Sequence, residues 1–148
     1  MYRKILVALE NGPADERLLP HIGEFARRLG ADLLLLHVAD GWAARNYEQL
    51  KLAESSEMKA DFEYLTTTAN KLIATGLKAE TLLALGNPPN EIVRVATEMN
   101  CDLIALASHG HKLFGDIVHG STIDKVRHNT TVPLLVVSAA KAATRPPV

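Results

Sequence analysis

Short, continuous runs of apolar residues recur along the chain, at residues 5–9, 33–38, 103–107 and 133–137, with a weaker run at 81–85. Continuous runs, as opposed to alternating apolar and polar positions, are typical of strands that are buried on both faces of a parallel sheet. The pattern therefore predicts five parallel strands.

Between these runs, apolar residues recur every three or four positions, which is typical of amphipathic helices. The first series contains Leu18, Ile22, Phe25 and Leu29, the second contains Met58, Phe62, Leu65, Ala69 and Leu72, and two shorter ones surround Ile92 and Ile123. Pro20 lies inside the first series, where its missing N–H removes a hydrogen bond, so we expect that helix to start late or to be kinked.

The alternation of strands and helices determines the predicted fold class. Repeated β-α-β units with right-handed crossovers build a doubly wound α/β fold, a three-layer sandwich around a five-stranded parallel sheet. In such sheets ligands bind beyond the carboxyl ends of the strands, where the strand order reverses. The loops to examine are therefore residues 10–13, 39–47 and 108–119.

Length and composition limit the classes of protein to which this chain can belong. The chain has 148 residues, 47% of them hydrophobic, which fits a single domain over residues 1–148 with a frayed tail at 139–148. Sixteen basic and seventeen acidic residues give a net charge of −1, without the basic excess of a nucleic-acid-binding protein. No stretch approaches the roughly 18 apolar residues of a membrane span, and the single Cys101 fits a reducing, cytoplasmic setting.

The segment after the fourth run carries the strongest candidate for a binding site. Gly110 lies in a loop after the strand pattern, and Gly120, Ser121 and Thr122 precede a helix-like run. A strand, a glycine-bearing loop and a helix that opens with Ser or Thr present backbone N–H groups to an anion, usually a phosphate. Turn and capping roles explain the same residues without a ligand, and neither standard phosphate-loop motif is present.

The same loop contains residue types that suggest two further chemistries. His109, His111 and His119 with Asp116 could hold a metal ion, although no ligand spacing fixes such a site, and a histidine in a phosphate loop can instead donate a hydrogen bond. Hydrolysis of a nucleotide needs a positioned base and a group that neutralises the charge that builds up on the phosphates. Glu10 and Asp116 are the acids considered for these roles, and they form no recognisable catalytic pair.

With these elements placed, the whole chain resembles the universal stress protein family, the UspA-like proteins. The resemblance rests on the motif Ser108-His109-Gly110, on Gly120-Ser121, on His37-Val38 at the end of the second run, and on the segments 4–10, 86–92 and 132–137. It implies an adenine nucleotide alpha hydrolase-like fold, which agrees with the three-layer sandwich predicted from the pattern.

The nucleotide-binding branch of this family is marked by Gly, two residues, Gly, nine residues, and then Gly and Ser or Thr. On this chain the motif falls on Ala107, Gly110, Gly120 and Ser121, so that the first glycine is missing, and Glu10 replaces an Asp at the end of the first strand. If the position of Ala107 needs a left-handed backbone, alanine costs about 1 kcal/mol relative to glycine. If its side chain faces the ligand, the methyl group crowds the pocket.

The resemblance implies ATP, with or without Mg²⁺, or another adenine nucleotide as the ligand. Val38 would meet the adenine through its backbone, Glu10 the ribose, and backbone amides near the glycines the phosphates. The complete set of expected contacts is Ala8, Leu9, Glu10, Val38, Leu106, Ala107, Gly110, His111, Gly120, Ser121 and Thr122.

The resemblance also implies a cytoplasmic stress-response protein that forms a homodimer through its last strand, between Leu134 and Val137. An edge strand exposes unpaired N–H and C=O groups, and Pro133 cannot donate to a ladder, so pairing would use the residues after it. Two alternatives remain open. The chain could be a dimeric interaction or signalling module of the same fold that binds no nucleotide, or a slow ATP hydrolase.

Overall fold

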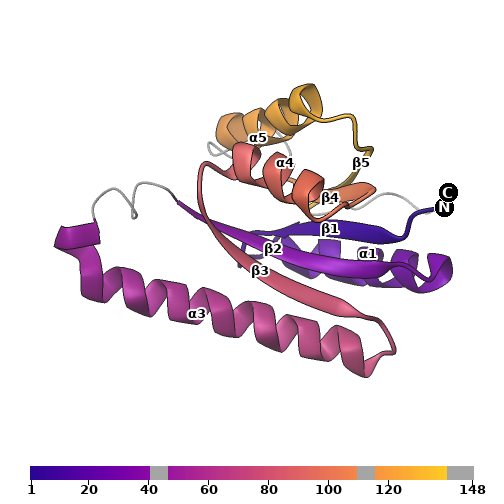
Figure 1. Ribbon diagram of the computed structural model, residues 1–148, viewed down its shortest axis with the longest axis horizontal. Helices are drawn as coiled ribbons and strands as arrows, with labels where there is room; N and C mark the ends of the chain where they lie inside the picture. Colours follow the sequence, from indigo (N-terminus) through magenta and orange to yellow (C-terminus); the bar gives the residue numbers. More distant parts are fainter. Residues whose placement is uncertain (41–46, 110–115, 140–148) are drawn as a thin grey trace, which may run out of the picture.

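A computed structural model describes residues 1–40, 47–109 and 116–139, with side chains described in 1–39, 56–109 and 122–139. Its centre is one parallel sheet with the strand order β3-β2-β1-β4-β5 (Figure 1). The strands are β1 (Lys4–Leu9), β2 (Asp32–Asp40), β3 (Ala79–Gly86), β4 (Leu103–Ser108) and β5 (Leu134–Ser138). The five predicted strands are confirmed, each within a few residues of its apolar run.

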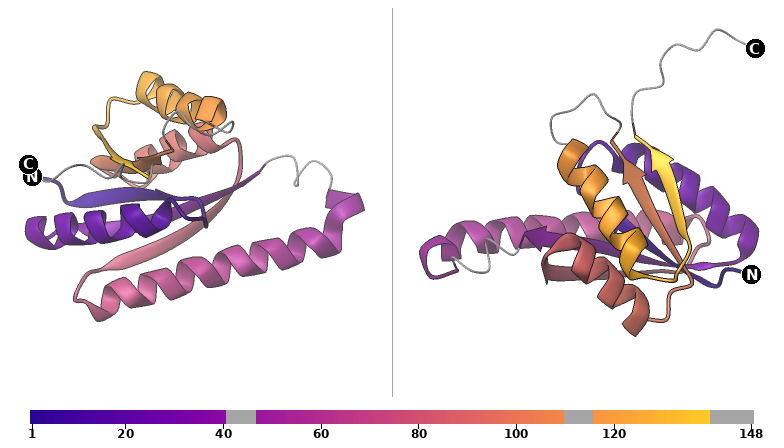
Figure 2. Two further views of the ribbon diagram at one scale, coloured as in Figure 1. Left: turned by 180° about the vertical axis from the view of Figure 1, so that it is seen from behind. Right: turned by 90° about the horizontal axis from the view of Figure 1, so that it is seen from above.

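Helices cover both faces of this sheet. In the described part of the chain they are α1 (Asp15–Leu29), α3 (Tyr47–Ala74), α4 (Pro88–Glu98) and α5 (Asp116–Asn129). The helices α1 and α3 lie together on one face, while α4 and α5 lie on the other (Figures 1 and 2). The predicted three-layer α/β sandwich is therefore confirmed.

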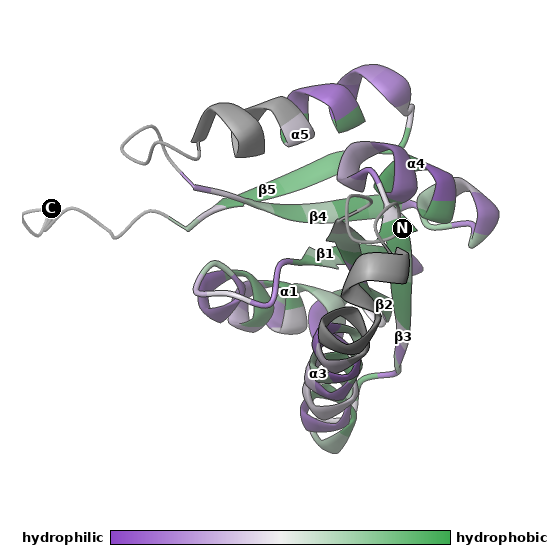
Figure 3. Cartoon of the chain, turned by 90° about the vertical axis from the view of Figure 1, so that its left-hand side faces the viewer, coloured by the Kyte–Doolittle hydropathy of each residue, from purple (hydrophilic) through white to green (hydrophobic). Residues whose placement is uncertain are grey.

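The apolar core consists of two clusters, one on each face of the sheet. Val7 and Leu35 point toward α1 and α3, whereas their neighbours Leu6 and Leu34 point toward α4 and α5. All four side chains are at most 1% exposed. Successive residues of a strand face opposite sides, so a strand covered on both sides must be apolar throughout. Figure 3 shows the apolar strands between helices whose outer faces are hydrophilic.

Two details of the helices differ from the predictions. α1 starts at Asp15 and contains Pro20 in its interior, so the expected late start is wrong. Pro20 is on the exposed side of the helix, where water can bind the carbonyl oxygen that lacks a donor. In α3, Phe62 is 57% exposed although its spacing matches the buried Leu65 and Ala69. The buried face of this helix is narrower than the apolar pattern indicates.

The order of the strands determines where a ligand can bind. From β1 the chain moves outward to β2 and β3, and it then crosses back to place β4 on the other side of β1. The strand order thus reverses between β1 and β4, and the carboxyl ends of these two strands flank a natural crevice. Glu10 follows β1 and His109 follows β4.

Among the helices of the described segments, none combines the length and the apolarity that crossing a bilayer requires.

Cys101 lies just before β4 and is 5% exposed, and burial raises the pKa of its thiol to about 11. We expect alkylation at pH 8 to be about 100-fold slower in the native protein than in the unfolded chain, because the thiolate is the reactive form. The folded state disfavours the thiolate, so Cys101 makes its full contribution to the free energy of unfolding below the pKa that its thiol has in the unfolded chain. That contribution is lost as the pH rises toward 11. The rate of iodoacetamide labelling measures the effect, and equal rates in both states would contradict the burial of this thiol.

Candidate functional site

A cavity of about 260 Å³ opens at the carboxyl ends of β1, β2 and β4, beside the point where the strand order reverses. It extends to the beginning of α4 and to the part of α5 that follows Ser121. The residues that line it are Ala8, Leu9, Glu10, Leu36, His37, Val38, Pro88, Ile92, Leu106, Ala107, Thr122 and Ile123.

Most residues of the predicted nucleotide site come together around this cavity. They are Ala8, Leu9, Glu10, Val38, Leu106, Ala107 and Thr122. Gly110 and His111 lie outside the described residues, whereas Gly120 and Ser121 belong to α5 but have no described side chains. The structure thus brings Val38 and Glu10, expected at the adenine and the ribose, to the same cavity as Thr122, expected near the phosphates.

The walls of the cavity are largely apolar. Ala8, Val38 and Leu106 face the α4/α5 side of their strands, where they pack with the apolar cluster that contains Ile92. Aliphatic walls on two sides of a narrow space suit a flat, weakly polar ring, and backbone groups at the strand ends supply hydrogen bonds for its edge. Chemically, the arrangement suits an aromatic base better than a fully polar ligand.

Helix α4 also borders the cavity, a role that no sequence pattern indicated, and the end of β3 places its first residues. Gly86 has a φ of 141°, a region that favours glycine, and Asn87 caps the helix by accepting a hydrogen bond from the Asn90 N–H.

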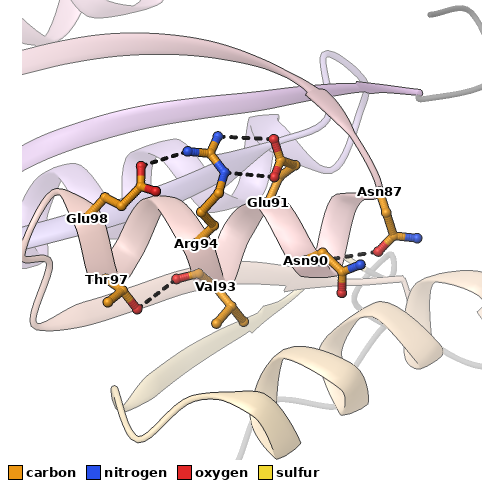
Figure 4. A network of polar contacts seen from close by, with 7 residues as sticks. All are labelled: Asn87, Asn90, Glu91, Val93, Arg94, Thr97 and Glu98. Atoms are coloured by element: carbon orange, nitrogen blue, oxygen red, sulfur yellow. Dashed lines mark hydrogen bonds and ion pairs between the residues drawn. The ribbon is translucent and has the colours of Figure 1, made fainter.

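The two faces of α4 differ in character. On the outer face Arg94 pairs with Glu91 and Glu98, at 2.9 and 2.7 Å (Figure 4). The hydrogen bond from Arg94 lowers the pKa of Glu91, so this pair persists at neutral pH. The opposite face of α4 presents Ile92 to the cavity.

A pair of side chains joins the two strand ends across the reversal. His109 Nε2 lies 2.8 Å from Glu10 Oε1 and 2.6 Å from Glu10 Oε2. A carboxylate only accepts hydrogen bonds, so Nε2 must carry the proton. The two side chains are 16% and 32% exposed, which strengthens their attraction relative to a pair on the surface. The sequence suggested the ribose as the partner of Glu10 and a metal ion as the partner of His109, and no local pattern indicated that the two side chains meet.

The metal hypothesis for this loop lies mostly outside the described residues. His111 is not described, and neither are the side chains of Asp116 and His119. Among the side chains that the structure describes, no three His, Cys, Asp or Glu residues are grouped as metal ligands.

Of the two conflicts considered at Ala107, the left-handed backbone does not occur. Ala107 is in strand β4 opposite Val137, and among the described non-glycine residues only Asn11 and Asn100 have a positive φ. Leu106 belongs to the apolar cluster on the α4/α5 side, and the next residue, Ala107, belongs to the cluster on the α1/α3 side. Ala107 borders the cavity at the end of its strand, but its methyl group packs into the core.

Replacing Ala107 with Gly is therefore expected to destabilise the protein by about 1 kcal/mol and to leave nucleotide affinity nearly unchanged, because it removes a buried methyl group and loosens a strand. Chemical denaturation measures the first effect and calorimetric titration with ATP the second. Tighter binding by the variant would show that the methyl group does restrict the ligand.

The start of α5 also differs from the prediction. The helix begins at Asp116, so Gly120, Ser121 and Thr122 lie inside it and do not open it. Residues 117–119 contain no Gly or Pro to stop a helix, and an acidic residue is favourable at a helix N-terminus. The capping role considered for Ser121 is therefore wrong.

Comparisons with known proteins agree with this architecture. The model of the universal stress protein family matches residues 1–138. Universal stress protein MJ0577 of Methanocaldococcus jannaschii is 27% identical over 154 residues, which cover 93% of this chain and 95% of that protein. A solved structure of the hypothetical protein MJ0577 matches with a TM-score of 0.82 at 27% identity, covering 93% of this chain and 96% of that one.

Two further solved structures of this fold contain adenine nucleotides. A universal stress protein of Archaeoglobus fulgidus in complex with dAMP has a TM-score of 0.64 at 23% identity, covering 92% of this chain and 98% of that one. A universal stress protein in complex with cAMP has a TM-score of 0.68 at 19% identity, covering 93% and 98%. The sheet order, the two helical layers and the match to the family model lead to one conclusion: the chain belongs to the universal stress protein family and has its adenine nucleotide alpha hydrolase-like fold.

Proposed function

We propose that this protein binds an adenine nucleotide, ATP in the first instance, in the cavity at the ends of β1, β2 and β4. The observation that carries the proposal is the combination of an apolar cavity with a carboxylate, Glu10, at the point where the strand order reverses. An apolar space accepts the base, and a carboxylate is a good acceptor for the two hydroxyl groups of a ribose. Relatives of the same fold in complex with dAMP and cAMP support the same class of ligand.

The phosphates would extend toward the residues that follow β4. Gly110, His111, Gly120, Ser121 and Thr122 remain the proposed phosphate contacts, with Mg²⁺ an optional companion of ATP. For Gly110 and His111 the contacts would be backbone N–H groups, which bind phosphate without a charged side chain. Gly120, Ser121 and Thr122 lie inside α5, where backbone N–H groups bond within the helix, so the hydroxyl groups of Ser121 and Thr122 would make the contacts and Gly120 would leave room for the phosphate. Thr122 lines the cavity, so the phosphates would leave the nucleoside space on the α5 side.

Binding is tested by two measurements on the complete chain. Mass spectrometry of small molecules released from the undialysed protein identifies a ligand that was bound during expression. Calorimetric titration with ATP, AMP and adenosine, with GTP as the control for the base, measures affinity and selectivity. We expect the adenine ligands to bind more tightly than GTP. Absence of both a released nucleotide and a heat of binding would favour the nucleotide-free interaction module.

We further propose that the protein acts in the cytoplasmic stress response as a homodimer built on β5. This strand is at an edge of the sheet and pairs with β4 on one side only. Val136 on this strand is 43% exposed, an apolar side chain beside an unpaired edge.

A further inference from the structure

The loop that carries Glu10 is held by side chains from outside it. We propose that Asp15 and Tyr64 are positioning residues for Glu10: together they fix the backbone from which its carboxylate reaches the cavity and His109. The inference rests on the proposed function where it concerns nucleotide affinity. The geometry of the Glu10–His109 pair can be tested without a nucleotide.

Asp15 is the central acceptor of this arrangement. Its side chain is on the first residue of α1 but accepts hydrogen bonds from residues before the helix, from the Glu10 N–H to Oδ1 at 3.0 Å and from the Asn11 N–H to Oδ2 at 2.9 Å. Asp15 is only 2% exposed. A buried carboxylate is stable when its oxygens accept several hydrogen bonds, and bonds between a charged acceptor and amides are stronger than neutral ones. Asp15 thus holds the loop more than it caps its own helix.

Tyr64 connects this carboxylate to α3. Its hydroxyl group donates to Asp15 Oδ2 at 2.5 Å, across a sequence separation of 49 residues. Burial, and then the hydrogen bond to the Asp15 carboxylate, raise the pKa of Tyr64 well above its ordinary value. The phenol therefore keeps its proton, and remains a donor, at neutral and moderately alkaline pH.

A second connection from α3 supports the residues on both sides of Glu10. Asn11, at a φ of 58°, donates from Nδ2 to Asp61 Oδ1 at 2.9 Å. The other oxygen of Asp61 lies 3.4 Å from His37 Nε2, and His37 Nδ1 donates to the Leu9 carbonyl at 2.9 Å. Three successive residues are thus held in place: the Leu9 carbonyl by His37 on β2, the Glu10 and Asn11 amides by Asp15, and the Asn11 side chain by Asp61 on α3.

These contacts limit the positions that the Glu10 carboxylate can reach. Its two carboxylate oxygens are 2.8 and 2.6 Å from His109 Nε2, distances at which a shift of one ångström in the loop would break the pair. In Asp15→Asn the amide NH₂ would replace one oxygen, so that a donor would face a backbone N–H in either orientation, that of Glu10 at the Oδ1 position or that of Asn11 at the Oδ2 position. Such a buried clash of donors is relieved by movement of the loop. Tyr64→Phe removes one donor and leaves both amide bonds in place, so its effect should be smaller.

The first experiment uses NMR of the complete protein without nucleotide. The ring Nε2–H proton of His109 reports its hydrogen bond to Glu10, and Glu10→Ala supplies the spectrum of the broken pair. We expect Asp15→Asn to shift this signal most of the way to its position in Glu10→Ala, and Tyr64→Phe to shift it in the same direction by less. Glu16→Gln, which removes the same charge from the next, exposed residue of α1, should leave it unchanged. A His109 signal that stays unchanged in folded Asp15→Asn or Tyr64→Phe would overturn the proposal.

The second experiment separates positioning from general stability by a double-mutant cycle on ATP affinity. We expect Asp15→Asn to weaken binding about tenfold in a protein that retains Glu10, and to have no further effect once Glu10 is Ala. Additive losses would mean that Asp15 acts independently of Glu10, and would overturn the proposal. If the wild-type protein binds no nucleotide, the proposed function fails, and the NMR signal of His109 alone decides the positioning role.

Discussion

Replacing Ala8 with Phe is expected to reduce the affinity for ATP, AMP and adenosine at least about 100-fold, which corresponds to about 2.7 kcal/mol. Ala8 lies near the end of β1, lines the cavity, and packs against the apolar cluster under α4 and α5. A phenyl ring at this position would occupy the space between the strand ends and α4 in which we place the base. The loss should be similar for the three ligands, because all of them share the adenine.

The control for this prediction is Ala74→Phe, the same substitution on an exposed residue at the end of α3. Calorimetric titration measures affinity, and thermal unfolding verifies that both variants fold. Ala8 is only partly buried, so we expect the larger side chain to be tolerated better there than in the closed core. Unchanged affinity in a folded Ala8→Phe protein would show that the nucleotide binds outside this cavity.

The fold could be predicted from the sequence because the patterns that indicate its strands and helices are local. The runs around Val7 and Leu35 are continuous, apolar and short, as a strand that is covered on both faces requires. The position of the site followed from the same information, since a doubly wound sheet places its ligand where the strand order reverses. Ala8, Glu10 and Val38 therefore line the cavity as the predicted strand ends require.

The contacts inside the site could not be predicted, because they join residues that are distant in the sequence. Glu10 and His109 are 99 residues apart, and Asp15 and Tyr64 are 49 apart. No periodicity specifies which rotamer or loop conformation brings such pairs together. The exposed Phe62 illustrates the reverse case, in which a residue matched the helical period but lies beyond the edge of the surface that α3 covers. Tertiary packing decided both outcomes.

The two edges of the sheet differ in their suitability for pairing with a second copy. The edge strand β3 carries Glu80 and Thr81, and Glu80 is 3.4 Å from Lys4 in an ion pair. Charged side chains on an edge oppose pairing with another strand. Both edge strands contain four consecutive apolar residues, Leu82 to Leu85 in β3 and Leu134 to Val137 in β5, but β5 carries no charged residue. An interface between copies is therefore expected at β5, with twofold symmetry and antiparallel strands, the arrangement in which one patch satisfies itself.

Replacing Val136 with Lys is expected to convert the dimer to a monomer at micromolar concentration. Val136 is 43% exposed, whereas Leu135 packs against the cluster on the α1/α3 side, so a charge at 136 acts on the interface without entering the core. In a symmetric dimer the substitution places two ammonium groups near the axis, and like charges at an interface cost several kcal/mol. Ile73→Lys, the same kind of change at a 48% exposed residue of α3, is the control that should remain dimeric. Sedimentation velocity measures the masses, and a wild-type protein that sediments as a monomer, or a Val136→Lys protein that stays dimeric, would contradict the proposed interface.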